Sequence, residues 1–495
     1  MPKALYIPLY TAAQVRELDR MAIHDKAVSG YQLMCRAGQA LADCVARRWP
    51  AVTEVCVLCG PGNNAGDGYV LARLLRESGL QTQVLFLSDP DRLRGDALRA
   101  ARDYLAAGGE AQAFSGSLPA RAGLLVDALL GTGLSRAVAG DYRLAIDQLN
   151  RHKAPILAAD IPSGLHADSG RVLGVAVKAH TTLTFIGRKR GLFTGTGVRC
   201  VGHVEFDDLQ VPGDVQASQS AEVQLIRQPA LGPLARAREA DAHKGDFGHV
   251  LVVGGNRGMA GATRLAAEAA ARCGAGLVTV ACRDCSVSGL NAGRYELMVH
   301  GVRQAAELDP LLSRASVVLI GPGLGQDRWS RQLFERVIAA KLPLVVDADA
   351  LNLLARDPLS RQNWILTPHP GEAGRLLQQP TSAVQQDRFA AVRQLADRYN
   401  GVAVLKGAGS LIARGAAGPI RLCDQGNPGM ASGGMGDVLG GMLAALLAQG
   451  LGLFEAASAG VWLHGKAADL AAGEHGERGL LAADLMPFLR KLINV

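Results

Sequence analysis

Apolar and polar positions follow two regular rhythms along most of this chain. Amphipathic helical patterns open it at 12–26 and 31–48, and short apolar runs then alternate with further helical patterns. The pattern predicts strands at 55–58, 83–87, 124–127, 156–159, 181–185 and 203–206, and helices at 67–78, 95–107 and 144–150. Short apolar strands that alternate with amphipathic helices indicate a parallel, doubly wound α/β sheet.

This rhythm breaks between 211 and 237, where Gln, Ser, Pro and Ala predominate, and a second alternating series starts at 249–253. We therefore expect two α/β domains, at residues 1–212 and 220–495. The most apolar stretch, 440–465, is interrupted by Gln449, Gly450, Gly452 and Glu455. It predicts two buried helices rather than a membrane span.

Composition and charge add limits to this picture. A chain of 495 residues is too long for one hydrophobic core. The net charge of +7 is spread without a basic run, which argues against nucleic-acid binding. The N-terminal segment lacks the apolar core of a secretion signal. Two C-x-x-C pairs, at Cys56/Cys59 and Cys282/Cys285, have no accompanying His cluster, so reduced thiols and a cytoplasmic location are expected.

The first candidate site follows the strand at 55–58. The segment GPGNNAGDG, at 60–68, is neither a P-loop nor a dinucleotide fingerprint, but it is a Gly-rich turn that leads to a helix N-terminus. Asn63 and Asn64 add amide oxygens that suit a cation, although a tight turn alone would use the same residues. Two other strands end at Asp127 and Asp160. Because ligands bind at the carboxyl ends of such strands, these segments are expected to meet in one crevice.

The second candidate site lies near the C-terminus. The segment GNPGMASGGMGD, at 426–437, precedes an apolar helix, and its free N–H groups suit an anion. Asp437 is either a helix cap or a general base beside a phosphoryl group in transfer, and its Gly-rich setting favours the base. Four more expected strands lead into GPGLG, DADALN, TPHPGE and KGAGS, at 321–325, 347–352, 367–372 and 406–410. The prolines beside His369 stiffen its loop and present the imidazole to a ligand. In the first half, the basic segment 188–190 is either a phosphate contact or a solvated loop.

Both halves resemble known enzyme families. Over about 10–210, the motifs GPGNNAGDG, VDALLGTGL and DIPSGL resemble the YjeF N-terminal family, the NAD(P)H-hydrate epimerases. From about 244 to the end, HKGDFGHVLVVGG, GPGLG, DADALN, TPHPGE, LKGAGS and GGMGD resemble the YjeF C-terminal family, the ADP- or ATP-dependent NAD(P)H-hydrate dehydratases. The resemblance implies a Rossmann-like domain followed by a ribokinase-like domain.

The resemblance also implies the site residues. The epimerase substrate would contact Asn63, Asn64, Ala65, Gly66, Asp67, Gly131, Thr132, Gly133, Leu134, Ser135, Arg136, Ala137 and Asp160. Potassium would be held by Asn64, Asp127 and Ser163, and Asp160 would also transfer protons. The dehydratase substrate would contact Ala262, Gly323, His369 and the catalytic Asp437. The adenine nucleotide would contact Lys406, Gly407, Ala408, Gly409, Ser410 and Gly436.

The implied chemistry is the repair of hydrated nicotinamide nucleotides. The epimerase would interconvert the R and S forms of NAD(P)HX, and the dehydratase would phosphorylate the C6 hydroxyl of the S form and expel phosphate. Mg²⁺ would accompany the nucleotide, and ADP is favoured because bacterial two-domain members typically use it. Small-molecule nucleotides are the expected partners, and the family suggests a homo-oligomer, a tetramer. Two alternatives stay open: a ribokinase-like vitamin kinase, and a non-catalytic binding module in the first half.

Overall fold

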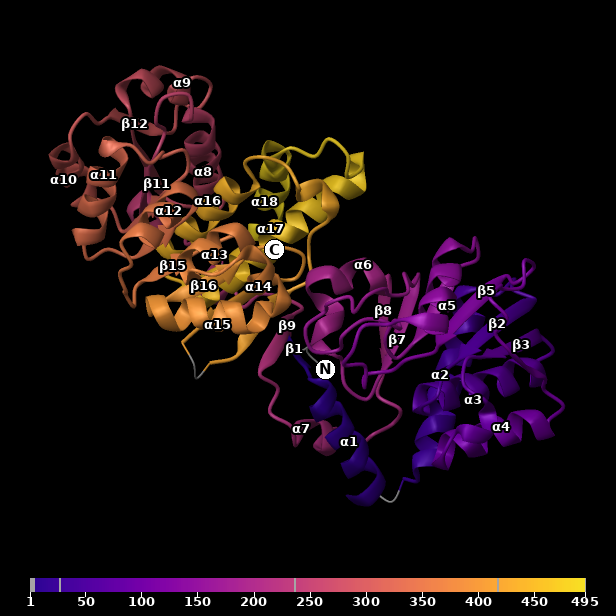
Figure 1. The fold of residues 1–495 in the computed structure, drawn as a ribbon. Coiled ribbons are helices and arrows are strands. Elements are labelled where there is room, and N and C mark those ends of the chain that lie inside the picture. The colour runs from indigo at the N-terminus through magenta and orange to yellow at the C-terminus, as the bar shows by residue number, and fades with distance from the viewer. Residues whose placement is uncertain (1–4, 26–27, 236, 416–417, 495) are drawn as a thin grey trace. The chain divides into compact units, whose positions relative to one another are not determined.

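The chain folds into two compact α/β units. The computed structural model describes residues 5–25, 28–235, 237–415 and 418–494. One unit is Pro8–Val223, and the other joins the residues up to Ile7 to Gln224–Val495 (Figure 1). Within the described residues, no helix is long and apolar enough to cross a membrane.

The first unit is built on a seven-stranded sheet in the order β4-β3-β2-β5-β6-β7-β8, and all neighbouring strands are parallel. Its strands are β2 (Glu54–Cys59), β3 (Gln81–Phe86), β4 (Ala111–Ala113), β5 (Leu124–Ala128), β6 (Ile156–Ala159), β7 (Thr181–Phe185) and β8 (His203–Asp207). The chain runs outward from β2 to β4 and then returns to β5 on the other side of β2. The strand order therefore reverses between β2 and β5, where doubly wound folds bind their ligands.

Helices cover both faces of this sheet. They are α1 (Ala12–Asp25), α2 (Gly30–Arg48), α3 (Asn63–Glu77), α4 (Gly95–Ala106), α5 (Gly140–Arg151), α6 (Val198–Val201) and α7 (Gly213–Ala217). Along β2, Val57 and Cys59 join the core under α1–α4, whereas Cys56 and Leu58 join the core under α5. A strand buried on both faces in this way has the continuous apolar sequence that Glu54–Cys59 shows after its first residue.

The second unit contains an eleven-stranded sheet in the order β1-β9-β18-β17-β16-β15-β14-β13-β10-β11-β12. Its strands are β1 (Tyr6–Leu9), β9 (Val223–Ile226), β10 (His249–Val253), β11 (Leu277–Cys282), β12 (Met298–Gly301), β13 (Val317–Ile320), β14 (Leu344–Val346), β15 (Trp364–Leu366), β16 (Val402–Leu405), β17 (Ser410–Arg414) and β18 (Ile420–Cys423). From β12 to β16 the neighbours are parallel, and β16 to β18 are antiparallel. Here the strand order reverses between β10 and β13, which predicts a second ligand site.

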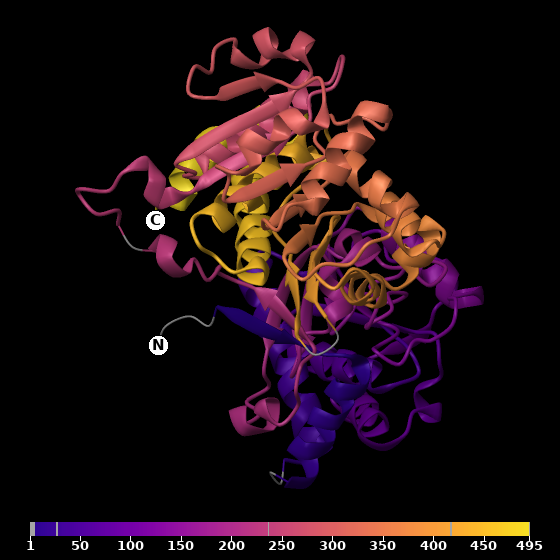
Figure 2. The ribbon, with the colours of Figure 1, turned by 90° about the vertical axis from the view of Figure 1, so that its left-hand side faces the viewer.

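The larger sheet is also covered on both faces. Its helices are α8 (Ala260–Arg272), α9 (Val287–Asn291), α10 (Asp309–Leu312), α11 (Arg328–Ala339), α12 (Ala348–Arg356), α13 (Pro370–Leu377), α14 (Thr381–Gln386), α15 (Arg388–Tyr399), α16 (Met435–Ala448), α17 (Leu453–His475) and α18 (Met486–Ile493). One core joins α8, α16, α17 and α18 to the strands, and the last three form the yellow part of Figure 2. The connections that contain α11 to α15 proceed along the sheet in the direction opposite to the connection that contains α8. Because such connections are right-handed, α11 to α15 lie on the face of the sheet opposite to α8.

The contact between α8 and α16 requires a glycine. A Cβ added at Gly441 would lie 2.0 Å from the Ala266 carbonyl oxygen, so the two backbones approach too closely for any side chain. We expect Gly441→Ala to destabilise the second unit by about 1–3 kcal/mol, measured by urea unfolding. The control is Gly473→Ala in α17, where an added Cβ meets nothing within 4 Å. This control should be neutral or slightly stabilising, and equal losses in both variants would contradict the packing argument.

The expected α/β class is confirmed, and the two apolar helices expected within 440–465 are α16 and α17. Two local expectations were wrong. Helix α3 begins at Asn63 rather than at Asp67, because the loop amides already belong to its first turn. Helix α5 begins at Gly140, four residues before the expected start. Strand β1 adds to the larger sheet beside β9, and the division into domains at 1–212 and 220–495 stays a prediction.

Candidate active sites

A cavity of about 590 Å³ opens at the β2/β5 reversal of the first unit. The loops after β2, β5 and β6 supply its floor, and α1 and α2 supply one wall. Among the residues proposed from the sequence, those that line the cavity are Asn63, Asn64, Asp67, Gly131, Thr132, Gly133, Leu134, Ser135, Arg136 and Asp160. Ala65 and Gly66 are buried below it, and a Cβ added at Gly66 would collide with the Met34 side chain. Ala137 is exposed and lies outside this lining.

Asp127 and Ser163 form a buried polar pair beside the cavity. The Ser163 hydroxyl donates to Asp127 Oδ1 over 2.6 Å, and the Ser163 amide donates to Oδ2 over 2.8 Å. Burial raises the pKa of Asp127 to about 6, although these hydrogen bonds oppose the rise. The Leu130 amide donates to Ser163 Oγ over 2.8 Å, so the pair fixes the loop that leads to Gly131.

Asn64 lies next to the same loop, because a Cβ added at Gly131 would lie 3.5 Å from the Asn64 Cβ. Its side-chain amide is buried, and neither the oxygen nor the nitrogen has a hydrogen-bond partner among the described residues. A buried polar group without a partner is costly, so its presence points to a bound ligand or ion. Oxygen atoms of an amide, a carboxylate and a hydroxyl are a donor set that suits a hard cation.

Asp160 is held in an unusual backbone conformation by a buried lysine. Its φ of 63° is left-handed, which is uncommon for a non-glycine residue. Lys189 is 1% exposed, forms an ion pair with Asp160 Oδ1, and donates to Thr184 Oγ1 over 3.1 Å and to the Phe185 carbonyl over 3.0 Å. For Lys189, the solvated-loop alternative for the segment 188–190 was therefore wrong, because this lysine is buried and lines the cavity. The phosphate contact stays a prediction.

Two further carboxyl groups line this cavity, Asp19 from α1 and Asp67 from α3. Burial raises the pKa of Asp19 to about 6, with an added contribution from Asp160 and an opposing one from Lys189. Burial raises the pKa of Asp67 well above its usual range, and the Asp160 and Asp19 carboxylates raise it further. The sequence analysis missed Asp19, because α1 carries no motif that distinguishes one acidic position from another.

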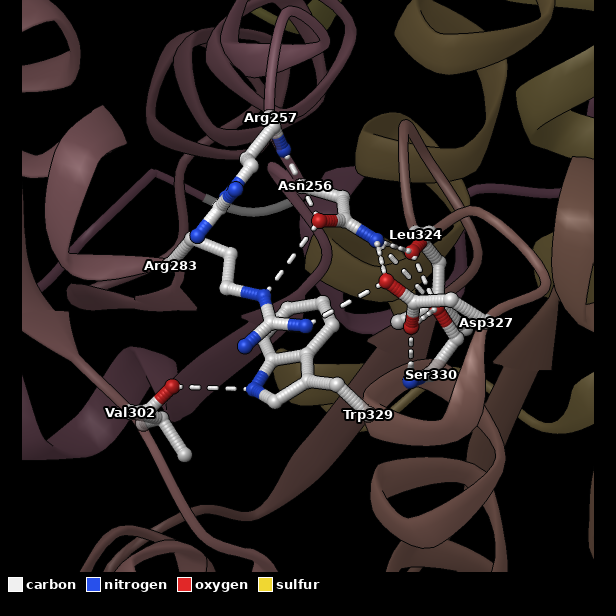
Figure 3. A network of polar contacts seen from close by, with 8 residues as sticks. All are labelled: Asn256, Arg257, Arg283, Val302, Leu324, Asp327, Trp329 and Ser330. Carbon is white, nitrogen blue, oxygen red and sulfur yellow. Dashed lines mark hydrogen bonds and ion pairs between the residues drawn. The ribbon is translucent and has the colours of Figure 1, made fainter.

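At the reversal between β10 and β13 of the second unit, one asparagine ties together the loops that follow the two strands (Figure 3). The Asn256 side chain donates to the Leu324 carbonyl over 3.0 Å and to Asp327 over 3.2 Å, and its backbone N–H donates to the Gly323 carbonyl over 2.7 Å. Arg283 completes the network with a bond to Asp327 over 3.2 Å and a position above the Trp329 ring. Asn256 thereby fixes the GPGLG loop that carries Gly323.

Gly323 itself has a φ of 58°, and a Cβ there would lie 2.4 Å from the Met259 carbonyl oxygen. Thr263, in the first turns of α8, donates to the Pro322 carbonyl over 2.8 Å. Ala262 is the neighbour of Thr263 and is half-buried. The structure therefore brings the first turn of α8, which carries Ala262, next to the loop that carries Gly323, as expected of two residues that contact one ligand.

Lys406 is the centre of a charged cluster at the ends of β14, β15 and β16. Its ammonium group donates to Asp347 Oδ1 over 2.9 Å and lies 3.9 Å from Glu372 Oε2. Asp347 is 1% exposed and also accepts from the Thr367 hydroxyl over 2.7 Å. Burial opposes the charged form of Lys406, but the neighbouring carboxylates outweigh it and raise the lysine pKa.

The same ammonium group lies on the first turn of α16. A Cβ added at Gly436 would lie 3.2 Å from Lys406 Nζ and 3.6 Å from Asp347 Oδ2. Asp437 is the next residue, and burial together with the Asp347 carboxylate raises its pKa to about 7, against the effect of Lys406. A general base with a pKa near neutrality is well matched to proton abstraction at physiological pH.

His369 caps α13, and its second ring nitrogen, Nε2, lies 3.4 Å from Glu372 Oε1. Its Nδ1 accepts from the amides of Gly371 over 3.0 Å and Glu372 over 3.3 Å, so a proton on the ring resides on Nε2. Burial and the charge of Lys406 lower the pKa of His369, which keeps the ring neutral. With about half of its side chain exposed, His369 presents an N–H donor to a ligand.

The KGAGS loop is supported from below by Arg388, which is 1% exposed. Its guanidinium donates over 3.3 Å to the carbonyls of Leu405, Lys406 and Gly409. The sequence analysis missed this arginine, since it lies outside every motif. Asp347 and Glu372 were present in the motifs DADALN and TPHPGE, but their pairing with Lys406 needed the folded sheet.

The comparisons with known proteins agree with this division into two sites. The family model described as YjeF-related protein N-terminus matches residues 30–191, and the model described as NAD(P)H-hydrate dehydratase matches residues 250–491. A Coxiella burnetii protein, "Bifunctional NAD(P)H-hydrate repair enzyme Nnr", is 49% identical over 98% of this chain and 99% of its own length. The Escherichia coli protein of the same name is 42% identical over 100% of this chain and 95% of its own length. A ribokinase-like superfamily protein from Enterococcus faecalis, known from its crystal structure, has a TM-score of 0.50 and 30% identity over 56% of this chain and 96% of its own.

Proposed function

The chain belongs to the family of bifunctional NAD(P)H-hydrate repair enzymes, and from this premise we propose how its two sites divide the work. The cavity of the first unit interconverts the R and S hydrates. The Lys406–Asp437 cluster of the second unit dehydrates the S form with ADP. The observation that carries this proposal is that each unit has, at the carboxyl ends of its parallel strands, a carboxyl group paired with a lysine, Asp160 with Lys189 and Asp347 with Lys406.

In the dehydratase, Asp437 removes the proton from the C6 hydroxyl of the S hydrate while that oxygen attacks the β-phosphoryl group of ADP. The N–H groups at the start of α16 and the Lys406 ammonium hold the negative charge of the phosphoryl oxygens. Phosphate then leaves C6 with the electron pair of the C6–O bond, a proton leaves C5, and the C5–H electron pair forms the C5=C6 double bond of the restored ring. Phosphate leaves far more readily than hydroxide, which is the reason for using a nucleotide. Gly323, Ala262 and the Nε2–H group of His369 position the hydrated ring.

Mg²⁺ would supply charge neutralisation on the nucleotide phosphates. The described residues contain no group of three or more Asp, Glu, His or Cys side chains that could hold a metal ion alone. A magnesium ion that arrives with the nucleotide phosphates needs only one or two carboxylates from the protein. Glu372 is the carboxylate that would receive it, because the ammonium of Lys406 lies 3.9 Å from Glu372 but bonds directly to Asp347 over 2.9 Å.

Potassium is supported in the first site by the unpartnered amide of Asn64, which adjoins Gly131, and by the Asp127–Ser163 pair, which fixes the loop that leads to Gly131. The ion would offset the buried charge of Asp127 and hold the loop that leads to Gly131. We expect Asn64→Ala to weaken potassium activation of epimerisation by at least about tenfold. The measurement is the epimerisation rate titrated with potassium, and the control is nucleotide-dependent dehydration of pure S hydrate by the same variant, which should not change. Equal potassium dependence in wild type and variant would contradict the assignment.

The whole proposal is tested with one mixture. Purified protein is incubated with the R and S hydrates of NADH, Mg²⁺ and potassium, with ADP or ATP in parallel, and the reduced-nicotinamide absorbance is followed. Recovery beyond the S fraction with ADP is the expected result. Recovery that stops at the S fraction would refute the epimerase, and recovery with ATP alone would refute the choice of ADP. An accumulating phosphorylated product would instead indicate the vitamin kinase, and an intact first site without epimerisation would indicate a binding module.

We further propose that the enzyme is cytoplasmic and that it assembles as a homo-oligomer, namely a tetramer. Substrates of both sites are small nucleotides, and the scattered charge of the chain offers no surface suited to nucleic acid. The location and the tetramer rest on the cysteine usage and on the family resemblance. Light scattering of the purified protein measures the assembly directly.

A further inference from the structure

The first unit gathers more carboxyl groups than substrate binding requires. Asp19, Asp67 and Asp160 line one cavity together with Lys189, and Lys189 forms its ion pair with Asp160. Asp160 also accepts from the Phe185 amide over 3.0 Å and from the Thr184 hydroxyl over 3.2 Å. This carboxylate is therefore well satisfied in its ionised form.

Asp67 has the opposite surroundings. Its carboxyl group makes no hydrogen bond or ion pair with any residue in the described part of the chain, although the amide backbone around it belongs to the first turns of α3. The charged groups that face the cavity are Arg16 and Asp19 on α1, Asp96 on α4, Arg136, Asp160 and Lys189. Of these, Lys189 opposes the rise in the pKa of Asp67, while Asp160 and Asp19 add to the effect of burial.

The helix dipole of α3 does not reverse this balance. A helix N-terminus lowers the pKa of a nearby carboxyl group by less than about one unit, and this effect fades within the first turn of the helix. Burial, together with the neighbouring Asp160 and Asp19 carboxylates, acts in the opposite direction and raises the pKa of Asp67. Asp67 therefore lines the cavity as a carboxyl group without a hydrogen-bond or ion-pair partner among the described residues, beside Asp160, whose carboxylate is paired with Lys189. Two carboxyl groups in such different surroundings can divide the roles of acid and base.

We propose that Asp67 is the general acid of the epimerase, and that the Lys189-paired Asp160 faces the positive charge formed on the substrate ring. This inference rests on the epimerase assignment made above and names the group that performs its proton transfer. Asp160, which the sequence suggested for proton transfer, is instead a fixed charge.

The step balances with the groups present. The Asp67 carboxyl gives its proton to the C6 hydroxyl, the C6–O bond breaks with its electron pair on oxygen, and water leaves. The lone pair of the ring nitrogen forms the C6=N1 bond, so the ring becomes a cation. Water then adds to the other face of C6, the π pair returns to nitrogen, and the proton lost by the water returns to Asp67. No oxidant, nucleotide or further reactant is consumed.

The charges in the cavity suit this course. With Asp67 neutral, the other charged side chains that line the cavity balance, since Arg16, Arg136 and Lys189 stand against Asp19, Asp96 and Asp160. The ring gains one positive charge during the reaction, and the Asp160 and Asp19 carboxylates are the groups that stabilise it. An ionised Asp67 at the start would add a further negative charge and offer no proton. The leaving hydroxyl would then depart as hydroxide, which is a much poorer leaving group.

The test follows epimerisation of pure S hydrate to R hydrate by the full-length protein with potassium and without nucleotide, so that dehydration does not interfere. Asp67→Asn should lower kcat by about 100-fold while changing KM little, because general acid catalysis contributes about 10²–10⁴-fold and the amide keeps the size of the side chain. Asp67→Glu keeps a carboxyl group and should retain a larger part of kcat. The matched control is Asp43→Asn, an exposed position on α2 whose carboxylate meets only Gln39.

The pH profile separates this role from a structural one. In the wild type, kcat should fall as pH rises through the raised pKa of Asp67, and this fall should disappear in Asp67→Asn. A wild-type kcat that rises with pH through neutrality would overturn the proposal, even if the asparagine variant failed to fold. A folded Asp67→Asn variant with kcat within tenfold of wild type would also overturn it. A wild type without epimerisation would refute the epimerase assignment itself, which keeps the two failures distinguishable.

Discussion

Replacing Asp437 by asparagine should reduce nucleotide-dependent dehydration by about 1000-fold, within the range that a positioned general base contributes. The amide keeps the size and the backbone position of the side chain, so the start of α16 and its contacts with Gly436 and Lys406 should remain. The measurement is kcat on pure S hydrate with saturating ADP and Mg²⁺. Epimerisation of the same sample should proceed at the wild-type rate, because its residues belong to the first unit.

The pH dependence of wild-type dehydration tests the same role of Asp437. Asp437 has a pKa raised to about 7, first by burial and then by the Asp347 carboxylate. A base acts only when ionised, so kcat/KM should be low in acid and rise as pH increases through about 7, since kcat/KM reports the free enzyme.

Asp357→Asn, at an exposed position after α12, is the matched control and should keep both the rate and the profile. An Asp437→Asn variant with more than a tenth of the wild-type kcat would show that Asp437 is a helix cap and that another group removes the proton.

Replacing Lys406 by methionine should lower the free energy of unfolding of the second unit by about 3–5 kcal/mol, and should also abolish the use of the nucleotide. The reason is that Asp347 is almost fully buried and would keep its charge without the ammonium group that now lies 2.9 Å away. Urea unfolding at pH 8 measures the loss. A Lys406→Met, Asp347→Asn double variant removes both charges and should recover most of the stability but none of the activity.

The sign of the pH effect follows from the raised pKa of Lys406. Its folded-state pKa lies above the ordinary value of 10.5, so its stabilisation is fully present below that pH and is lost as pH rises through the higher folded value. The wild type should lose this stabilisation in strong alkali, and Lys406→Met should not show that loss. A single variant as stable as wild type, or a double variant no more stable than the single one, would contradict the role assigned to the pair.

Local sequence patterns were sufficient for most elements of both sheets. The strands β6 and β10 have the bounds expected at 156–159 and 249–253, because a strand buried on both faces needs an unbroken apolar stretch. Element starts were less well predicted. The turn signal of Asn63 and Asn64 concealed that both residues already belong to α3, since the same glycines and amides serve a loop and a helix N-terminus.

In the candidate sites too, some residues could be predicted from the sequence and others could not. The motifs named Asp127 and Asp160 at strand ends, because a ligand site in a doubly wound fold uses those positions, and they named Asp437 at the glycine-rich start of α16. They did not reveal that Lys189 is buried against Asp160, because a basic run in a sequence looks the same in solvent and in a core. Asp19 carried no signal at all, since its role depends on where α1 packs.

The sequence by itself determined the two α/β units, the family and the loops that carry the chemistry, because periodicity and motif spacing are local properties of the chain. Only the tertiary structure decided which charges meet. Lys406 and Asp347 are 59 positions apart, and Lys189 and Asp160 are 29 apart. Burial and neighbouring charge set whether each carboxyl group is an acid, a base or a fixed charge, and both are properties of the folded chain alone.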